Sequence, residues 1–377
     1  MIDPFNVQHE MKVPFYEKLF KFHSGLITHR AREKAMYLRC FGGGRLANLR
    51  CPPLHALTNG KWLKRLVYFL LFLAFLYVLF IATQCWKLYL YDMMGWKREK
   101  FICVKFRGRL ANQMFDYAFL YAFAQKKGLS MIVPPSDLTK AFGIQPKTGD
   151  QYGFSRYMCW CFWTIDDKWN CAYDTSFEDL EKNTDLSFRG FFQSWKYWKD
   201  YDADLRKIFV FQDDIKEKAR FSMRKILKET GKKPLQGSVL VGIHVRRGDH
   251  IERSDVNYGK LVATEGYLNN SMNYFRQKFK DVLFVVISDD IPWTSNALRK
   301  FKDVYIVTGN SGEVDMCLLT MTNHTIMSVG TFGWFIGWMT QGIVIYYKNV
   351  ARPGSGYEWE FGPGIQDHFL PHWIGME

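Results

Sequence analysis

The stretch VLVGIHVRRGDH, residues 239–250, decides the fold of the C-terminal part of the chain. An almost wholly apolar run ends at Val245 and is followed at once by two arginines, a glycine and an aspartate. This predicts a buried strand over Val239–Val245 with a polar loop at its carboxyl end. Beyond it, short apolar strands alternate with helices, which is typical of a doubly wound parallel sheet. The predicted strands are Leu283–Ile287, Val304–Val307, Thr325–Ser328 and Ile343–Tyr347, and the predicted helices are Gly266–Lys280, Trp293–Phe301, Val314–Met321 and Thr331–Gln341.

A second strand–turn–helix unit lies upstream. FICVKF, residues 101–106, predicts a strand, Gly108 a turn, and Asn112–Lys127 a helix. Residues 130–200 are rich in aromatic side chains and are expected to be irregular, and Lys199–Lys228 is predicted as one charged helix. The breakers in GKKP, residues 231–234, mark a domain boundary. The sequence thus predicts an α/β protein with an N-terminal domain over 101–233 and a C-terminal domain over 234–377.

Residues 66–86 form an uncharged, almost wholly apolar stretch. Its 21 residues would extend about 30 Å as a helix, enough to cross a bilayer. A buried core helix is the alternative, but such a helix rarely lacks a polar face over this length. Residues 1–65 carry 12 Lys/Arg against 4 Asp/Glu, so they are predicted to form a cytoplasmic tail before a transmembrane signal-anchor, with a stem over 87–100. The net charge of +14 is therefore explained by membrane topology and not by nucleic-acid binding.

Three of the eight cysteines, Cys159, Cys161 and Cys171, cluster in the aromatic segment. One or two disulfides are expected there, with connectivity left open, and a zinc site built on Cys-x-Cys is a minor alternative. Cys85 is counted within the membrane span. Two sequons predict glycosylation at Asn269 and Asn323.

Polar clusters follow three of the predicted strands, at residues 246–249, 288–290 and 330–331. Arg246 and Arg247 could hold a phosphate bidentately, with Asp249 orienting an arginine, although a pair of surface arginines would look the same. Asp289 and Asp290 follow the next strand, where they could accept from a base or a ribose. Because the carboxyl ends of parallel strands share one edge of the sheet, a ligand site is expected there.

Two helix starts could also bind an anion through their free N–H groups. Asn112 lies near the first of these and could equally be only a cap. Thr331 begins the second, directly after a predicted strand.

These motifs occur together and in a fixed order. HVRRGD (244–249), GRLANQM (108–114), FVVISDD (284–290) and TFGWFIGW (331–338) resemble the α-1,2-fucosyltransferase family, in a nematode-like form. The resemblance implies a GT-B-like two-domain transferase and a type II Golgi membrane protein. It also implies a GDP-fucose donor, a galactose-terminated glycan acceptor, inversion at the anomeric carbon, and no metal or other cofactor.

The resemblance also assigns roles to residues. It places Arg247 and Asp249 in catalysis, and Arg247→Ala would be expected to lower kcat by about 10²-fold or more. The donor-binding residues that it implies are His244, Arg246, Arg247, Asp289, Asp290, Thr331, Phe332, Asn112, Arg109 and Gln113. The aromatic segment 151–200 is expected either to select the acceptor by ring stacking or to serve only in packing.

Two rival hypotheses remain open. Asp289 and Asp290 could instead bind a metal in a GT-A-type transferase. Alternatively, Ala111, which stands where the family usually has glycine, would fit an inactive, membrane-anchored glycan-binding protein.

Overall fold

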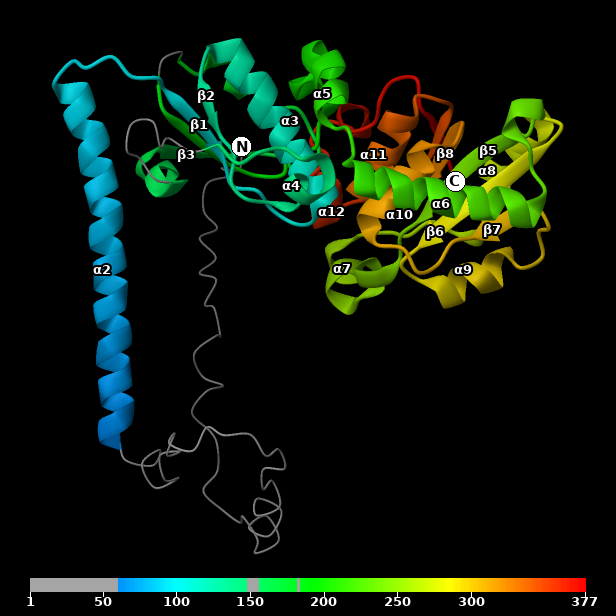
Figure 1. The fold of residues 1–377 in the computed structure, drawn as a ribbon, viewed down its shortest axis with the longest axis horizontal. Helices are drawn as coiled ribbons and strands as arrows, with labels where there is room; N and C mark the ends of the chain where they lie inside the picture. Colours follow the sequence, from blue (N-terminus) through cyan, green and yellow to red (C-terminus); the bar gives the residue numbers. More distant parts are fainter. Residues whose placement is uncertain (1–59, 148–155, 182–183) are drawn as a thin grey trace, which may run out of the picture. The chain divides into compact units, whose positions relative to one another are not determined.

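A six-stranded sheet, parallel throughout, forms in the C-terminal part of the chain (Figure 1). The computed structural model describes residues 60–147, 156–181 and 184–377. The strand order is β10-β9-β8-β5-β6-β7. The strands are β5 (Val239–Val245), β6 (Val282–Ser288), β7 (Val304–Ile306), β8 (His324–Met327), β9 (Val344–Tyr347) and β10 (Ile374–Met376).

The chain enters this sheet at β5, adds β6 and β7 on one side, and then returns to add β8, β9 and β10 on the other. This is the doubly wound order that the sequence predicts, and it puts the switch point between β5 and β8. β5 has the predicted bounds, and it pairs with β6 from Val239↔Val282 to Val245↔Ser288. The helices of this part are α7 (Arg253–Tyr258), α8 (Glu265–Lys278), α9 (Ile291–Leu298), α10 (Gly312–Thr320), α11 (Thr331–Thr340) and α12 (Gly356–Trp359).

A smaller parallel sheet of four strands, in the order β2-β1-β4-β3, precedes it. Its strands are β1 (Phe101–Val104), β2 (Ser130–Ile132), β3 (Trp163–Asp166) and β4 (Leu186–Arg189). The prediction that residues 130–200 are irregular is wrong, since three of these strands lie there. They are only three or four residues long, and hydrogen bonds to neighbouring strands define them more than an apolar run does.

Helices α3 (Leu110–Lys127), α4 (Asp137–Phe142), α5 (Asp202–Ile208) and α6 (Asp213–Thr230) belong to the same part. The single helix expected over 199–228 is broken between α5 and α6. Phe209 and Phe211 are both buried, and the non-helical connection between the two helices contains them.

Both sheets share one hydrophobic core, and residues 71–377 form one compact unit. Phe115 on α3 packs against Trp334 and Phe335 on α11, with ring centroids 4.8 and 4.6 Å apart. The expected boundary between residues 233 and 234 falls in the connection from α6 to β5.

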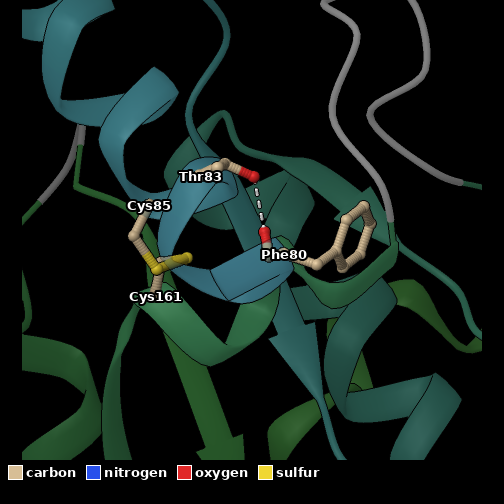
Figure 2. Close-up of a disulfide and its surroundings, with 4 residues drawn as sticks. All are labelled: Phe80, Thr83, Cys85 and Cys161. Carbon is tan, nitrogen blue, oxygen red and sulfur yellow. Dashed lines mark hydrogen bonds between the residues drawn. A yellow bond between two sulfur atoms is a disulfide. The ribbon is translucent and has the colours of Figure 1, made fainter. Parts of the chain in front are cut away.

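Helix α2 (Gly60–Met93) contains the predicted membrane span and is long and apolar enough to cross a bilayer. A disulfide joins Cys85, near the C-terminal end of α2, to Cys161 (Figure 2). A second disulfide joins Cys103 on β1 to Cys159. The expectation of disulfides in the aromatic segment is confirmed, but each bond reaches a distant cysteine, and Cys171 is a buried thiol. Cys85 lies within the predicted span, near its C-terminal end. Neither Cys159 nor Cys161 is free to bind zinc, because both are in disulfides.

Candidate functional site

A cavity of about 850 Å³ lies where loops from the carboxyl ends of both sheets meet. Its walls include residues that follow β1, β3 and β4 of the smaller sheet, and β5, β6 and β8 of the larger one. It therefore adjoins the switch point between β5 and β8, where ligands of doubly wound sheets bind.

Arg246 follows β5 and forms part of the cavity wall. Its backbone N–H donates to Ser328 Oγ at 2.8 Å, which holds it at the switch point. Its Nη2 donates to Asp249 Oδ1 at 2.6 Å, and its Nη1 lies 2.9 Å from Asp289 Oδ2. Because a guanidinium has five N–H donors, these contacts leave donors that can bind an anion in the cavity.

The two carboxylates beside Arg246 are held closely. Asp289 Oδ1 accepts from the Arg247 backbone N–H at 2.8 Å, and a Cβ on Gly248 would lie only 2.5 Å from Asp289 Oδ2. Glycine at position 248 therefore permits this approach. Burial would raise the pKa of Asp249, but the charges of Arg246 and His250 and the hydrogen bond from Arg246 lower it overall, so this carboxylate stays ionised.

The side chain of Arg247 lies outside the cavity, against Trp293 and Asp290. Its guanidinium carbon lies 3.9 Å from the ring centroid of Trp293, and its Nε donates to Asp290 Oδ2 at 3.3 Å. Asp290 also caps α9, where its Oδ1 accepts from the Trp293 N–H at 3.1 Å. Neither Arg247 nor Asp290 lines the cavity. Of the predicted arginine pair only Arg246 lines it, and of the predicted aspartate pair only Asp289 does.

His244 lies on β5 and lines the cavity, with a side chain that is 6% exposed. Burial, followed by the charges of Arg246 and His250, lowers its pKa to about 3. The imidazole is therefore neutral at physiological pH. Its Nδ1 has no hydrogen-bond partner in the described part of the chain. The ring centroids of His244 and Phe332 are 5.3 Å apart.

Thr331 and Asn112 join the two sides of the cavity. Thr331 Oγ1 donates to Asn112 Oδ1 at 2.7 Å, so the start of α11 is bonded to the first turn of α3. Gly330, with φ of +86°, makes the bend that leads from β8 into α11. The first N–H groups of α11 thus adjoin the cavity, as an anion site requires.

Arg109 and Gln113 take different places. Arg109 lines the cavity with a side chain that is 78% exposed, and its Nη2 lies 3.7 Å from Asp249 Oδ2. Gln113 is buried, donates to Gly108 O at 3.0 Å and accepts from the Asp137 N–H at 2.9 Å. It supports the turn before α3 and does not line the cavity.

The outer wall holds residues that the sequence analysis misses. Lys260 Nζ donates to Asp255 Oδ2 at 2.8 Å, and the Tyr258 hydroxyl donates to Glu360 Oε1 at 2.6 Å. No motif connects these residues, because their positions depend on loops far apart in the sequence. Further wall residues of this kind are Asn170, Phe191, Gln193, His250 and Tyr357.

For the aromatic segment, the structure supports mainly the packing alternative. Among its described rings only Phe191 lines the cavity, whereas Phe192 and Trp198 are buried in the core. The predicted glycosylation residues also lie outside the wall: Asn269 is half-buried on α8, and Asn323 is exposed, with its Oδ1 accepting from the Leu240 N–H at 2.9 Å.

The loop after β3 carries a pH-sensitive group, Asp167. Burial raises its pKa to about 7, with a further rise from Asp174 and an opposing hydrogen bond from the Phe192 N–H. Between about pH 4 and 7 the folded state therefore binds a proton that the unfolded chain does not. Stability should fall across this window as pH rises, by at most about 4 kcal/mol. Melting temperatures at pH 5 and 8 should differ less in Asp167→Asn than in the parent, whereas Asp179→Asn, at an exposed position, should leave the difference unchanged.

Comparison with known proteins settles the family. Residues 75–377 match the model described as Glycosyl transferase family 11. The chain belongs to this family. The family 11 chain is 32% identical to Galactoside 2-alpha-L-fucosyltransferase SEC1 of Bos taurus, over 72% of both proteins. It is 30% identical to Galactoside alpha-(1,2)-fucosyltransferase 2 of Oryctolagus cuniculus, over 74% of this chain and 77% of that protein. The resemblance inferred from the sequence motifs is confirmed.

Solved structures similar to the family 11 chain include two kinds of fucosyltransferase. NodZ alpha-1,6-fucosyltransferase soaked with GDP-fucose superposes with a TM-score of 0.42 and 14% identity, covering 68% of this chain and 98% of that one. POFUT1 in complex with GDP superposes with a TM-score of 0.38 and 13% identity, covering 65% of this chain and 95% of that one. The α/β fold of the family 11 chain rests on its own strand order.

Proposed function

We propose that this protein is a galactoside 2-α-L-fucosyltransferase, which transfers L-fucose from GDP-fucose to the 2-hydroxyl of a galactose in a glycan, with inversion. Its family and the names of its relatives support this reaction. The structural observation that carries the proposal is the position of Arg246. Its guanidinium lines a cavity at the switch point, together with the start of α11.

Breaking the bond between fucose and phosphate leaves negative charge on the departing GDP. A preorganised cation in a sheltered cavity stabilises such charge without reorganisation. Arg246 fits this role because Asp249 and Asp289 hold its guanidinium in place. The N–H groups at the start of α11 would bind the same diphosphate. Asp249 then acts as a positioning residue for Arg246. Arg247 stabilises the loop after β5 through its contacts with Trp293 and Asp290 outside the cavity.

We also propose that the reaction needs no metal. The charge arrangement supports this, because Asp289 is engaged by Arg246 and Asp290 by Arg247. A GT-A-type site would require these carboxylates to be free for a cation. Transfer should therefore continue in EDTA, and its loss, with recovery on adding Mn²⁺ or Mg²⁺, would favour the rival hypothesis.

The proposed location is the Golgi membrane in type II orientation, with the catalytic unit in the lumen. Helix α2 contains an apolar stretch long enough to cross a bilayer, and the basic excess of residues 1–65 precedes that stretch. The proposed acceptor-side and donor-side domains are 101–233 and 234–377, each with its own parallel sheet.

The test uses the full chain in detergent, with GDP-fucose and a panel of terminal β-galactosides. We expect release of GDP and a product whose fucose is removed by an α-1,2-specific fucosidase. Arg246→Ala protein serves as the matched blank. If the parent binds galactosides but forms no more product than this blank, the protein is a glycan-binding protein and the proposal is wrong.

A further inference from the structure

Two exposed tryptophans lie beside the end of the apolar helix. Trp160, in the 3₁₀ helix η3 (Arg156–Cys161), is 67% exposed, and Trp163, at the start of the edge strand β3, is 80% exposed. Neither residue lines the cavity. Both rings are therefore accessible from outside the described part of the chain.

Two contacts attach this segment to α2. The Cys85–Cys161 disulfide joins η3 to the helix covalently (Figure 2). Trp160 also meets Tyr77 edge to face, with ring centroids 6.0 Å apart. Beneath them Leu88 of α2 packs in a small core with Met158 and Phe162. The position of Trp160 along α2 is thus fixed.

That position is inside the uncharged stretch. Tyr77 precedes Lys87, the first charged residue after the stretch, by ten residues, which is about 15 Å along a helix axis. If α2 crosses a bilayer core of about 30 Å, a ring in contact with Tyr77 cannot stay in bulk water. It must therefore lie within the bilayer.

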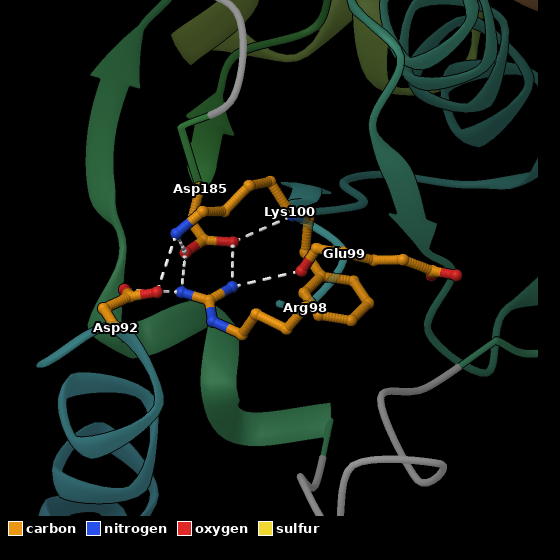
Figure 3. Close-up of polar contacts among 6 residues, drawn as sticks. Asp92, Arg98, Glu99, Lys100 and Asp185 are labelled. Carbon is orange, nitrogen blue, oxygen red and sulfur yellow. Dashed lines mark hydrogen bonds and ion pairs between the residues drawn. The ribbon is translucent and has the colours of Figure 1, made fainter. Parts of the chain in front are cut away.

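The junction between α2 and the smaller sheet is stiff as well. The Arg98 side chain is 1% exposed and binds Asp92 at the end of α2 and Asp185 just before β4 (Figure 3). Lys100 adds a second ion pair to Asp92 at 2.9 Å. Ion pairs to a nearly buried arginine hold the catalytic unit against the helix end.

We propose that Trp160 and Trp163 form a membrane-docking surface, which inserts into the bilayer on the side of the catalytic unit. The lipid is the partner, recognised by aromatic side chains and not by a specific headgroup. This inference depends on α2 crossing the membrane but not on the reaction that the enzyme performs.

The test uses the full chain in phosphatidylcholine nanodiscs, with a photoreactive benzoylphenylalanine at one position at a time. We expect lipid adducts, detected by mass spectrometry, at positions 160 and 163. Phe72, within the apolar stretch, is the positive control, and Phe221, 65% exposed on α6, is the negative control. Adducts at position 72 without adducts at 160 and 163 would overturn the proposal, as would a lack of adducts at all three positions.

A second measurement does not depend on the photoreactive group. Brominated lipids should quench less tryptophan fluorescence in Trp160→Phe than in the parent. Trp359→Phe, at an exposed position on α12, should not reduce the lipid-dependent part of the quenching. Equal quenching of the parent and Trp160→Phe would contradict the proposal. Fucose transfer measured on the same samples should be unchanged by Trp160→Phe, which separates this result from the proposed function.

Discussion

Arg246→Ala should lower kcat for fucose transfer by about 10²-fold or more, the size expected on removing a preorganised donor from developing charge. Arg246 forms part of the cavity wall and is held by Asp249 and Asp289. Removal of its guanidinium would leave the departing diphosphate without a side-chain cation at the switch point. Steady-state kinetics with GDP-fucose and a galactoside measure the effect directly.

Two matched variants distinguish this role from general damage. Arg247→Ala should cost kcat clearly less, because its side chain stacks on Trp293 outside the cavity. Arg224→Ala, on the exposed face of α6, should cost nothing. All three proteins should retain cooperative thermal unfolding. A larger loss in Arg247→Ala than in Arg246→Ala would mean that the diphosphate binds elsewhere than the cavity geometry indicates.

Cys85→Ser should destabilise the catalytic unit by about 3 kcal/mol, because the disulfide to Cys161 closes a ring of about 20 residues while Cys103–Cys159 stays intact. That ring runs through the end of α2 and the start of β1, since the Cys103–Cys159 bond already closes the loop that holds α3, β2 and α4. For a unit of this size, the expected fall in melting temperature is about 5 °C. Differential scanning fluorimetry of the full chain in detergent measures it.

The partner cysteine supplies the control for this experiment. Cys161→Ser should give the same shift as Cys85→Ser, and the double variant should add almost nothing, since either change alone opens the bond. An additive loss in the double variant would show that the two thiols stabilise the fold by packing and not by their bond.

The sequence predicts most of the larger sheet because its strands have clear local sequence patterns. β5 and β6 are each seven residues long and almost entirely buried, so their apolar runs are unbroken and their ends are marked by polar clusters. β10 escapes prediction, because Ile374–Met376 is a three-residue edge strand that contains a glycine.

The smaller sheet is harder to predict for the same physical reason. β3 is largely exposed, and β3 and β4 end in Asp166 and Arg189, which bond to each other across the strands. Short strands with charged ends lack both an apolar run and a clean alternation. The pairing of β4 with β1 joins residues about 80 positions apart, such as Ile102 and Leu186, which a local pattern does not contain.

The candidate site shows a similar division. The sequence places polar residues at the correct ends of the correct strands, but it does not tell which arginine of a pair reaches the ligand. The side chain of Arg247 stacks on Trp293 outside the cavity, and Trp293 lies on α9, which follows the next strand, β6. The outer wall, including Lys260 and Glu360, depends on loops that meet only in the folded chain.

The covalent bond between Cys85 and Cys161 also bears on shedding of the enzyme. A protease that cuts the backbone between Met93 and Phe101 would separate α2 from β1 in sequence. The two fragments would nevertheless remain joined through sulfur, because one half-cystine lies on each side of the cut. Liberation of a soluble transferase by such a cut therefore requires a reductant in addition to a protease.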